Sequence, residues 1–298
     1  MSVTSPCTGI CKLEPETGWC LGCGRSGSEI ADWRNHPEPW RSAVWEEIPR
    51  RLRQIGVGFQ RLPWTTEDIR DFVMTSLDRN EGTWVMGVVG AVAEFTGAPG
   101  SAISVTPEGD ALLAYTRGAA MRMLIDDDIR ALTFDPEGAS SKDGSEGQGR
   151  IVLAVKRERG RMAAIETVTD VGEDRGRLIE DRETRLYDLG LGRKEARFCV
   201  RVAPGASREA LRRVEGQPFA EALPYIGAPL VAESPTRVVE TPLGRIEIEG
   251  QIPPAGARSP AGPHTHLLPD HLATGRALPV GMDLPRAYLP GAIFYPRA

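Results

Sequence analysis

Apolar residues recur at helical spacing near the start of the chain. Residues 40–52 place an apolar side chain every three or four positions, which predicts an amphipathic helix that Pro49 should kink or split. A Ser-x-x-Glu capping box at residues 26–29 predicts a shorter helix before it. Residues 65–68 supply the start of a third helix.

From residue 83 onward the pattern changes to short apolar runs separated by glycine, proline and aspartate, which predicts strands. The predicted strands are 84–95, 102–105, 111–115, 121–125, 129–134, 151–155, 163–168 and 198–202, with a hairpin over 238–248. Residues 138–150 are polar and glycine-rich and predict a loop.

Two further helices are expected in the second half of the chain. Residues 180–189 predict a helix that Gly190 closes, and Ser207 is expected to cap a basic helix that runs to Val214. Beyond Gly250 proline recurs every few residues, so the tail should be extended and irregular.

These patterns predict an α+β fold in two parts. Residues 1–54 form a small cysteine and helical module, residues 55–64 a linker with glycine and proline breaks, and residues 65–298 a larger domain. The larger domain should be a mainly antiparallel sheet with a proline-rich C-terminal tail. A module of this size cannot hold itself together by burial alone, so a bound metal should supply much of its folding energy.

Charge and hydropathy exclude two classes of partner. A net charge of -5 argues against a broad phosphate-binding surface, so no nucleic-acid partner is expected. The most apolar run, residues 84–95, is too short to cross a bilayer and carries Glu94, so no membrane partner is expected. The first residues lack the pattern of a secretory signal, which predicts a cytoplasmic location.

Four of the five cysteines stand together in the first segment. They are Cys7, Cys11, Cys20 and Cys23, spaced as Cys-x3-Cys, eight residues, then Cys-x2-Cys. Two short loops can then offer two thiolates each to one point, as a tetrahedral metal ion or a four-iron cluster requires. In a reducing compartment such cysteines favour metal ligation over the alternative of two disulfides.

Spacing alone leaves the metal open. Four thiolates are the complete ligand set of a [4Fe-4S] cluster, and Gly9, Gly22 and Gly24 permit turns whose backbone N–H groups can point at sulfur. The Cys-Leu-Gly-Cys-Gly run also suits a zinc or mononuclear iron site, although the first pair has three intervening residues.

The same segment resembles a known family, the small YdhL-type domain of unknown function, which is described as a predicted Fe-S protein. The resemblance rests on Ser5 to Cys11, the turn at residues 15–18, Cys20 to Arg25, residues 29–33, and Val44 with Trp45. It implies an iron-sulfur centre at the four cysteines and a redox or iron-sulfur assembly protein as partner. Elements in the rest of the chain are similar to uncharacterised proteobacterial proteins, and no activity follows from that likeness.

A second candidate site is the histidine-rich segment at residues 262–271. In an extended strand His264 and His266 point the same way, so both imidazoles could reach one metal ion or flank one substrate. Asp270 or His271 could complete the ligand set. The alternative is that these histidines only pack and hydrogen-bond an irregular segment.

Other polar groups favour structural interpretations. The run Asp188 to Gly192 lacks the strand, glycine spacing and helix of a dinucleotide fingerprint and suits a helix stop. Cys199 should be buried and inert, and residues 126–128 favour a solvated turn over a site for a hard cation. Glu94 is either a functional carboxylate or the point where a strand leaves for water, and we favour the second.

The sequence therefore predicts a bacterial metal-binding protein with a structural or electron-transfer centre at the four cysteines. Two alternatives stay open: a metal-dependent enzyme that uses His264 and His266, and a zinc-stabilised interaction adaptor. No catalytic residue or small-molecule substrate is indicated.

Overall fold

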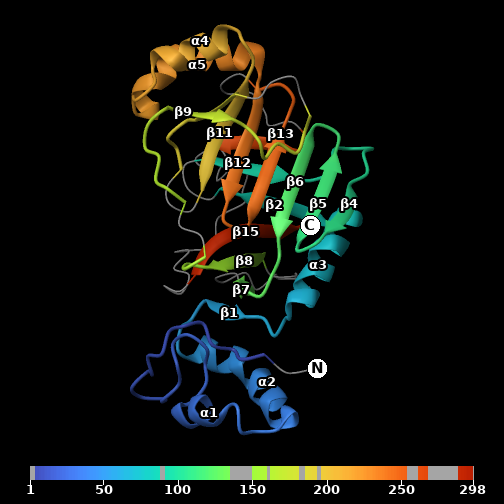
Figure 1. The fold of residues 1–298 in the computed structure, drawn as a ribbon. Helices are drawn as coiled ribbons and strands as arrows, with labels where there is room; N and C mark the ends of the chain where they lie inside the picture. Colours follow the sequence, from blue (N-terminus) through green and yellow to red (C-terminus); the bar gives the residue numbers. More distant parts are fainter. Residues whose placement is uncertain are drawn as a thin grey trace, which may run out of the picture.

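The computed structural model describes residues 4–87, 91–134, 150–159, 162–180, 185–192, 196–253, 261–267 and 288–297. Helices and two large antiparallel sheets lie within these ranges, which confirms the α+β class (Figure 1). The helices are α1 (Gly27–Asp32), α2 (Glu38–Gln54), α3 (Thr66–Asp78), α4 (Ala206–Arg213) and α5 (Phe219–Glu233).

The first sheet contains the C-terminal strand and both halves of the most apolar run. Its order is β1-β7-β8-β15-β2-β3-β14, and neighbouring strands are antiparallel. Its strands are β1 (Phe59–Arg61), β2 (Gly82–Met86), β3 (Ala91–Phe95), β7 (Ile129–Phe134), β8 (Arg150–Lys156), β14 (His264–Leu267) and β15 (Tyr288–Pro296).

The second sheet is built mainly from the middle of the chain. Its order is β4-β5-β6-β13-β12-β11-β10-β9, also antiparallel throughout. Its strands are β4 (Ser104–Glu108), β5 (Ala111–Thr116), β6 (Ala119–Leu124), β9 (Thr169–Glu173), β10 (Arg185–Asp188), β11 (Arg197–Val202), β12 (Thr236–Thr241) and β13 (Gly244–Ile248).

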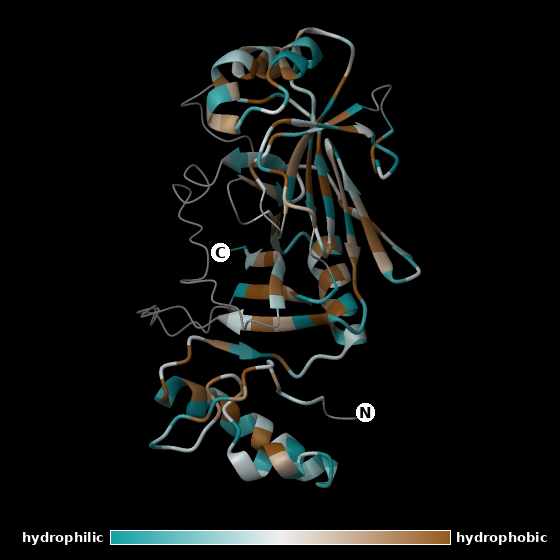
Figure 2. Ribbon diagram, turned by 60° about the vertical axis from the view of Figure 1, so that its left-hand side comes forward, coloured by the Kyte–Doolittle hydropathy of each residue, from teal (hydrophilic) through white to brown (hydrophobic). Residues whose placement is uncertain are grey.

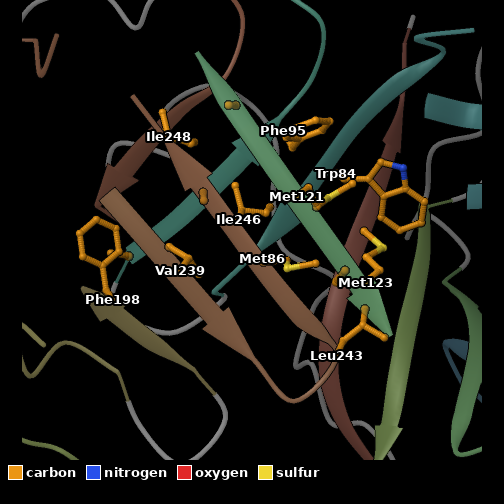
Figure 3. Packing of buried hydrophobic residues seen from close by; sticks show 14 of the residues in the cluster. Trp84, Met86, Phe95, Met121, Met123, Phe198, Val239, Leu243, Ile246 and Ile248 are labelled. Atoms are coloured by element: carbon orange, nitrogen blue, oxygen red, sulfur yellow. The ribbon is translucent and has the colours of Figure 1, made fainter. Parts of the chain in front are cut away.

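The main core lies between the two sheets. Figure 3 shows Trp84, Met86 and Phe95 of the first sheet beside Met121 and Ile246 of the second, and all five side chains are buried in one cluster. Helix α3 adds its apolar face to this cluster, and the capping box predicted at residues 65–68 starts it. Burial of this apolar area is the main force that holds the sheets together.

The N-terminal module has a small core of its own at the lower end of the molecule in Figure 1. Helix α1 begins with the predicted capping box, and α2 runs through Pro49 as one helix. Hydrophobic and hydrophilic residues alternate along these helices in Figure 2, and the buried side chains form an aromatic-rich cluster. The cluster consists of Trp33, Val44, Trp45, Ile48 and Leu52.

Part of the segment predicted as a linker belongs to a sheet. Residues 59–61 form β1, which pairs with β7 at the edge of the first sheet. Helix α2 is therefore followed within a few residues by a strand of the first sheet.

The helix predicted at residues 180–189 is wrong for the part that the structure describes. Residues 185–188 form β10, which has β9 on one side and β11 on the other. Leu186, Tyr187 and Asp188 are all buried, so this interior strand lacks the polar alternation of a half-exposed strand. The neighbouring prediction of a strand at 163–168 is also wrong, because the strand begins at Thr169.

Helices α4 and α5 differ from the sequence prediction as well. The N-cap of α4 is Gly205, and its first N–H groups donate to the Glu233 carboxylate, from Ala206 at 2.7 Å and from Ser207 at 2.9 Å. Helix α5 escaped prediction because Pro224 and Pro229 lie inside it.

The tail is not irregular throughout, as the proline spacing predicted. Strand β15 is an interior strand of the first sheet, between β8 and β2. Its register shifts between Pro290 and Ala292, and a bulge is where a strand can accept a proline. The intervening Gly291 has no room for a side chain, because a Cβ there would lie 2.6 Å from Leu243 Cβ.

Candidate metal centres

Glu94, His264 and His266 lie on neighbouring strands of the first sheet. Strands β14 and β3 pair with His264 opposite Glu94 and His266 opposite Val92. Alternate residues of a strand, and residues directly opposed across a pair, share a face, so all three side chains project from one face. Val92 packs in a separate cluster from the inter-sheet core, which places this face on the side away from the second sheet.

The three polar groups converge. His266 Nε2 lies 3.4 Å from Glu94 Oε1, and His264 Nε2 lies 3.9 Å from Glu94 Oε2. The imidazole rings are 4.0 Å apart between centroids and nearly perpendicular, at 72°. One ligand atom from each of the three residues lies within 4.8 Å of the others.

All three residues are buried. Glu94 is 0% exposed, His264 8% and His266 6%. A carboxylate taken out of water costs several kcal/mol unless a counter-charge and hydrogen bonds compensate it. A cation between these groups would add a positive charge beside the carboxylate.

The orientation of His264 is fixed by the backbone. Its Nδ1 lies 2.7 Å from the carbonyl oxygen of Gly262, which can only accept, so Nδ1 carries the proton and Nε2 presents its lone pair toward Glu94. A histidine that binds metal through one nitrogen almost always donates its other N–H in this way.

Gly262 reaches that position because it lacks a side chain. Its φ is +110°, a conformation that residues with a Cβ rarely adopt. A Cβ there would also lie 2.9 Å from the Cβ of Ala98. The residue therefore sets both the chain direction and the tautomer at His264.

The structure changes the sequence-based view of this site. Glu94 was expected at the exit of a strand into water, which is wrong, because it is fully buried and faces both histidines. His264 and His266 do share a face, as predicted, while Asp270 and His271 lie outside the described residues. The signal that could have found Glu94 is a carboxylate at an interior position of an otherwise apolar strand.

The second candidate site is formed by the two cysteine loops. Cys20 and Cys23 are buried, Cys7 is half-buried and Cys11 is exposed. Two backbone N–H groups donate to sulfur, Gly9 to Cys7 and Gly22 to Cys20, both at 3.4 Å.

The loops approach each other closely. The Cys20 thiol donates to the carbonyl of Ile10 at 2.8 Å, and the Thr8 hydroxyl donates to the carbonyl of Gly22 at 2.9 Å. A Cβ on Gly22 would lie 2.4 Å from the Thr8 hydroxyl oxygen and 2.7 Å from Ile10 Cβ. This glycine lets one loop lie directly against the other.

The surroundings of Cys23 combine burial with positive charge. Burial raises the pKa of its thiol to about 11, and the neighbouring Arg25 opposes this effect. Arg25 Nε lies 3.5 Å from the Cys23 sulfur, and its guanidinium stacks over Trp33 at 4.7 Å. A metal ion would convert the thiol to a thiolate and bring that charge next to Arg25.

The first cysteine loop is anchored from two sides. The Trp45 indole donates to the carbonyl of Thr4 at 2.9 Å, within the module. Arg61, on β1 of the first sheet, donates to the carbonyls of Ser5 and of Cys7, the latter at 3.2 Å. The loop that carries Cys7 is thus held by both parts of the chain.

The two candidate sites differ in how far they are assembled. Among the described residues, the set with at least three ligand atoms within 4.8 Å of one another is Glu94, His264 and His266. The four cysteines are not part of such a set. The remaining cysteine, Cys199, is fully buried, as predicted.

In the part of the chain that the structure describes, no helix has the length and apolar character needed to cross a membrane.

Comparison with known proteins gives families without an assigned function. The model of a protein of unknown function (DUF1289) matches residues 5–52, which include the four cysteines, and the segment is similar to that family. No curated protein and no solved structure matches the chain. The model of a family of unknown function (DUF6925) matches residues 68–298, more than half of the chain, and the protein belongs to this family.

Proposed function

We propose that this protein binds a divalent transition-metal ion through Glu94, His264 and His266. The observation that carries the proposal is the convergence of two imidazole nitrogens and one carboxylate on a buried point of the first sheet. Two histidines and one carboxylate form a ligand set used for zinc and for non-haem iron(II).

The surroundings of the three residues fit such an ion. His264 already has its second nitrogen committed to the carbonyl of Gly262, and its Nε2 faces the carboxylate. A metal ion would accept the Nε2 lone pair of His264 and would place a positive charge beside the carboxylate of Glu94.

Three protein ligands are typical of a catalytic metal site, whereas structural zinc sites usually have four. When bound, the ion would supply Lewis acidity and a water of lowered pKa. The chain's own contribution is to hold the ligands on two paired strands, with the tautomer of His264 set by the backbone. We therefore favour a metal-dependent enzyme over an adaptor for the larger domain.

Metal analysis of folded variants tests this proposal. Full-length protein with His264→Ala and His266→Ala should hold about one equivalent less zinc or iron than the wild type. His36→Ala is the matched control, because His36 stacks on Trp40 in the N-terminal module and is not one of the three proposed ligands. Equal metal content in the double variant and the wild type would overturn the proposal.

A second metal centre is proposed at Cys7, Cys11, Cys20 and Cys23. The specific support is the pair of N–H···S bonds, from Gly9 and Gly22, that metal-binding cysteine loops also use. We favour a [4Fe-4S] cluster with a structural or one-electron role, zinc being the alternative, in a reducing cytoplasm. A redox or iron-sulfur assembly protein would then be its partner.

The identity of this second centre is tested by purification without oxygen. Brown protein with about four iron and four acid-labile sulfide per chain supports the cluster. Colourless protein that holds zinc and no sulfide contradicts it. Cys199→Ala is the control, because this cysteine lies in the second sheet and should leave both readouts unchanged.

A further inference from the structure

A polar pocket of about 570 Å³ lies at the edge of the second sheet and is lined by residues of β9, β10 and α4 and by Glu215. Figure 1 shows α4 at the top of the molecule, above β9. Its lining side chains are all polar or charged: Asp170, Arg185, Tyr187, Arg208, Arg212 and Glu215. The metal site proposed above lies in the other sheet, so this pocket is independent of it.

One acid of the pocket is already neutralised. Asp170 Oδ2 accepts from Arg185 Nε at 2.9 Å and from Arg185 Nη2 at 2.6 Å. The register of β9 against β10 shifts at Leu186 and Tyr187, so Asp170 lies opposite Tyr187. A bulge of this kind re-aims the side chains beside it.

The two arginines of α4 are available for a ligand. Arg208 and Arg212 are four residues apart, so they lie on the same face of the helix. In the described part of the chain neither forms an ion pair, whereas Arg213 lies 3.8 Å from Glu209. Guanidinium groups bind oxyanions with paired hydrogen bonds of fixed geometry.

Tyr187 adds a buried donor to the pocket. The residue is 0% exposed, and its hydroxyl oxygen is buried with no hydrogen bond of good geometry among the described groups. Burial raises the pKa of the phenol, the nearby Asp170 raises it further and Arg208 opposes the shift. The hydroxyl therefore keeps its proton. A buried hydroxyl without a good partner costs free energy that a ligand oxygen would recover.

The pocket combines three guanidiniums with two carboxylates, so it is positive on a chain whose net charge is -5. We propose that it binds the phosphate group of a small molecule, with Arg208 and Arg212 on one side and the Tyr187 hydroxyl on the other. A phosphate offers enough oxygens for donors on two sides, whereas a carboxylate has only two.

Calorimetric titration of the full-length protein with inorganic phosphate tests the proposal. Arg208→Gln and Arg212→Gln should each weaken binding by about 10-fold or more, and Tyr187→Phe by about 5-fold, since each removes a donor. Arg213→Gln is the matched control, because it sits on the same helix with the same charge and is outside the pocket lining. Its affinity should equal that of the wild type.

Titrations with phenyl phosphate and with acetate identify the class of ligand. Tighter binding of phenyl phosphate than of inorganic phosphate supports a phosphate monoester as ligand, and equal binding supports free phosphate. Acetate should bind at least about 10-fold more weakly than phosphate. The proposal is overturned if the wild type does not bind phosphate, if acetate binds as well, or if Arg213→Gln weakens binding as much as the two pocket variants.

Discussion

Replacing Glu94 by glutamine tests how metal affinity is coupled to stability. Glutamine keeps the size of the side chain but removes the charge and the strongest oxygen donor of the site. The two carboxylate oxygens lie 3.4 and 3.9 Å from the two imidazole nitrogens, and among the described residues this cluster contains no other carboxylate.

The magnitude follows from mass action. An ion present at 100 times its dissociation constant stabilises the folded state by about 2.7 kcal/mol. For a chain of this size that is a rise in melting temperature of roughly 5–10 °C. If Glu94→Gln weakens affinity about 100-fold, the same ion concentration adds only about 0.4 kcal/mol, or roughly 1 °C.

The assay is thermal unfolding with and without zinc, at one protein concentration. The cysteine module is the same in wild type and variant, so the difference between their zinc-dependent shifts reports on the sheet site alone. Glu108→Gln, an exposed carboxylate on β4, is the control and should keep the wild-type shift. A full zinc-dependent shift in Glu94→Gln would show that this carboxylate is not a metal ligand.

Three further predictions concern the backbone and buried charge. Gly262→Ala should weaken metal binding by about 10–100-fold in a folded protein, because it displaces the carbonyl that orients His264; competition with a chelator measures this. Gly291→Ala should lower the free energy of unfolding by about 1–3 kcal/mol in urea, since the new Cβ would meet Leu243; a change under 0.5 kcal/mol would contradict the tight contact between the sheets. Burial raises the pKa of Asp188 to about 6, so the folded state binds more protons than the unfolded state between about pH 4 and pH 6. Asp188 should therefore contribute a loss of about 3 kcal/mol in stability as pH rises through that window. Urea unfolding at several pH values measures this contribution as the difference between the pH dependence of the wild type and that of Asp188→Asn.

Local patterns in the sequence predict local structure well. The capping boxes at residues 26–29 and 65–68 start helices in the structure, because each involves only groups within one turn. The hairpin over residues 238–248 is confirmed for the same reason, since its register depends on its own turn.

What the sequence could not supply is the pairing of distant segments. His264 and His266 share a face in any strand, so that part of the site is predictable. Their partner Glu94 depends on β14 pairing with β3, and no local pattern specifies that register. Strand β15 was not predicted for the same reason. Its prolines indicate an irregular tail, and only its bulge and its two neighbouring strands explain how an interior strand accepts them.

A buried strand that follows charged residues is also hard to predict from the hydropathy pattern. In β10 the residues Leu186 to Asp188 are all buried because strands flank it on both sides. An interior strand loses the alternation that marks a half-exposed one, and the charged residues before it then favour a helix.

We propose above that one metal ion binds among Glu94, His264 and His266. Anomalous diffraction from crystals of the zinc-loaded protein, recorded on both sides of the zinc absorption edge, tests it most directly. We expect a peak about 2.0–2.2 Å from one oxygen of Glu94 and from the Nε2 atoms of both histidines. Zinc found only at the cysteine loops, with the three side chains of the sheet hydrogen-bonded to one another, would contradict it.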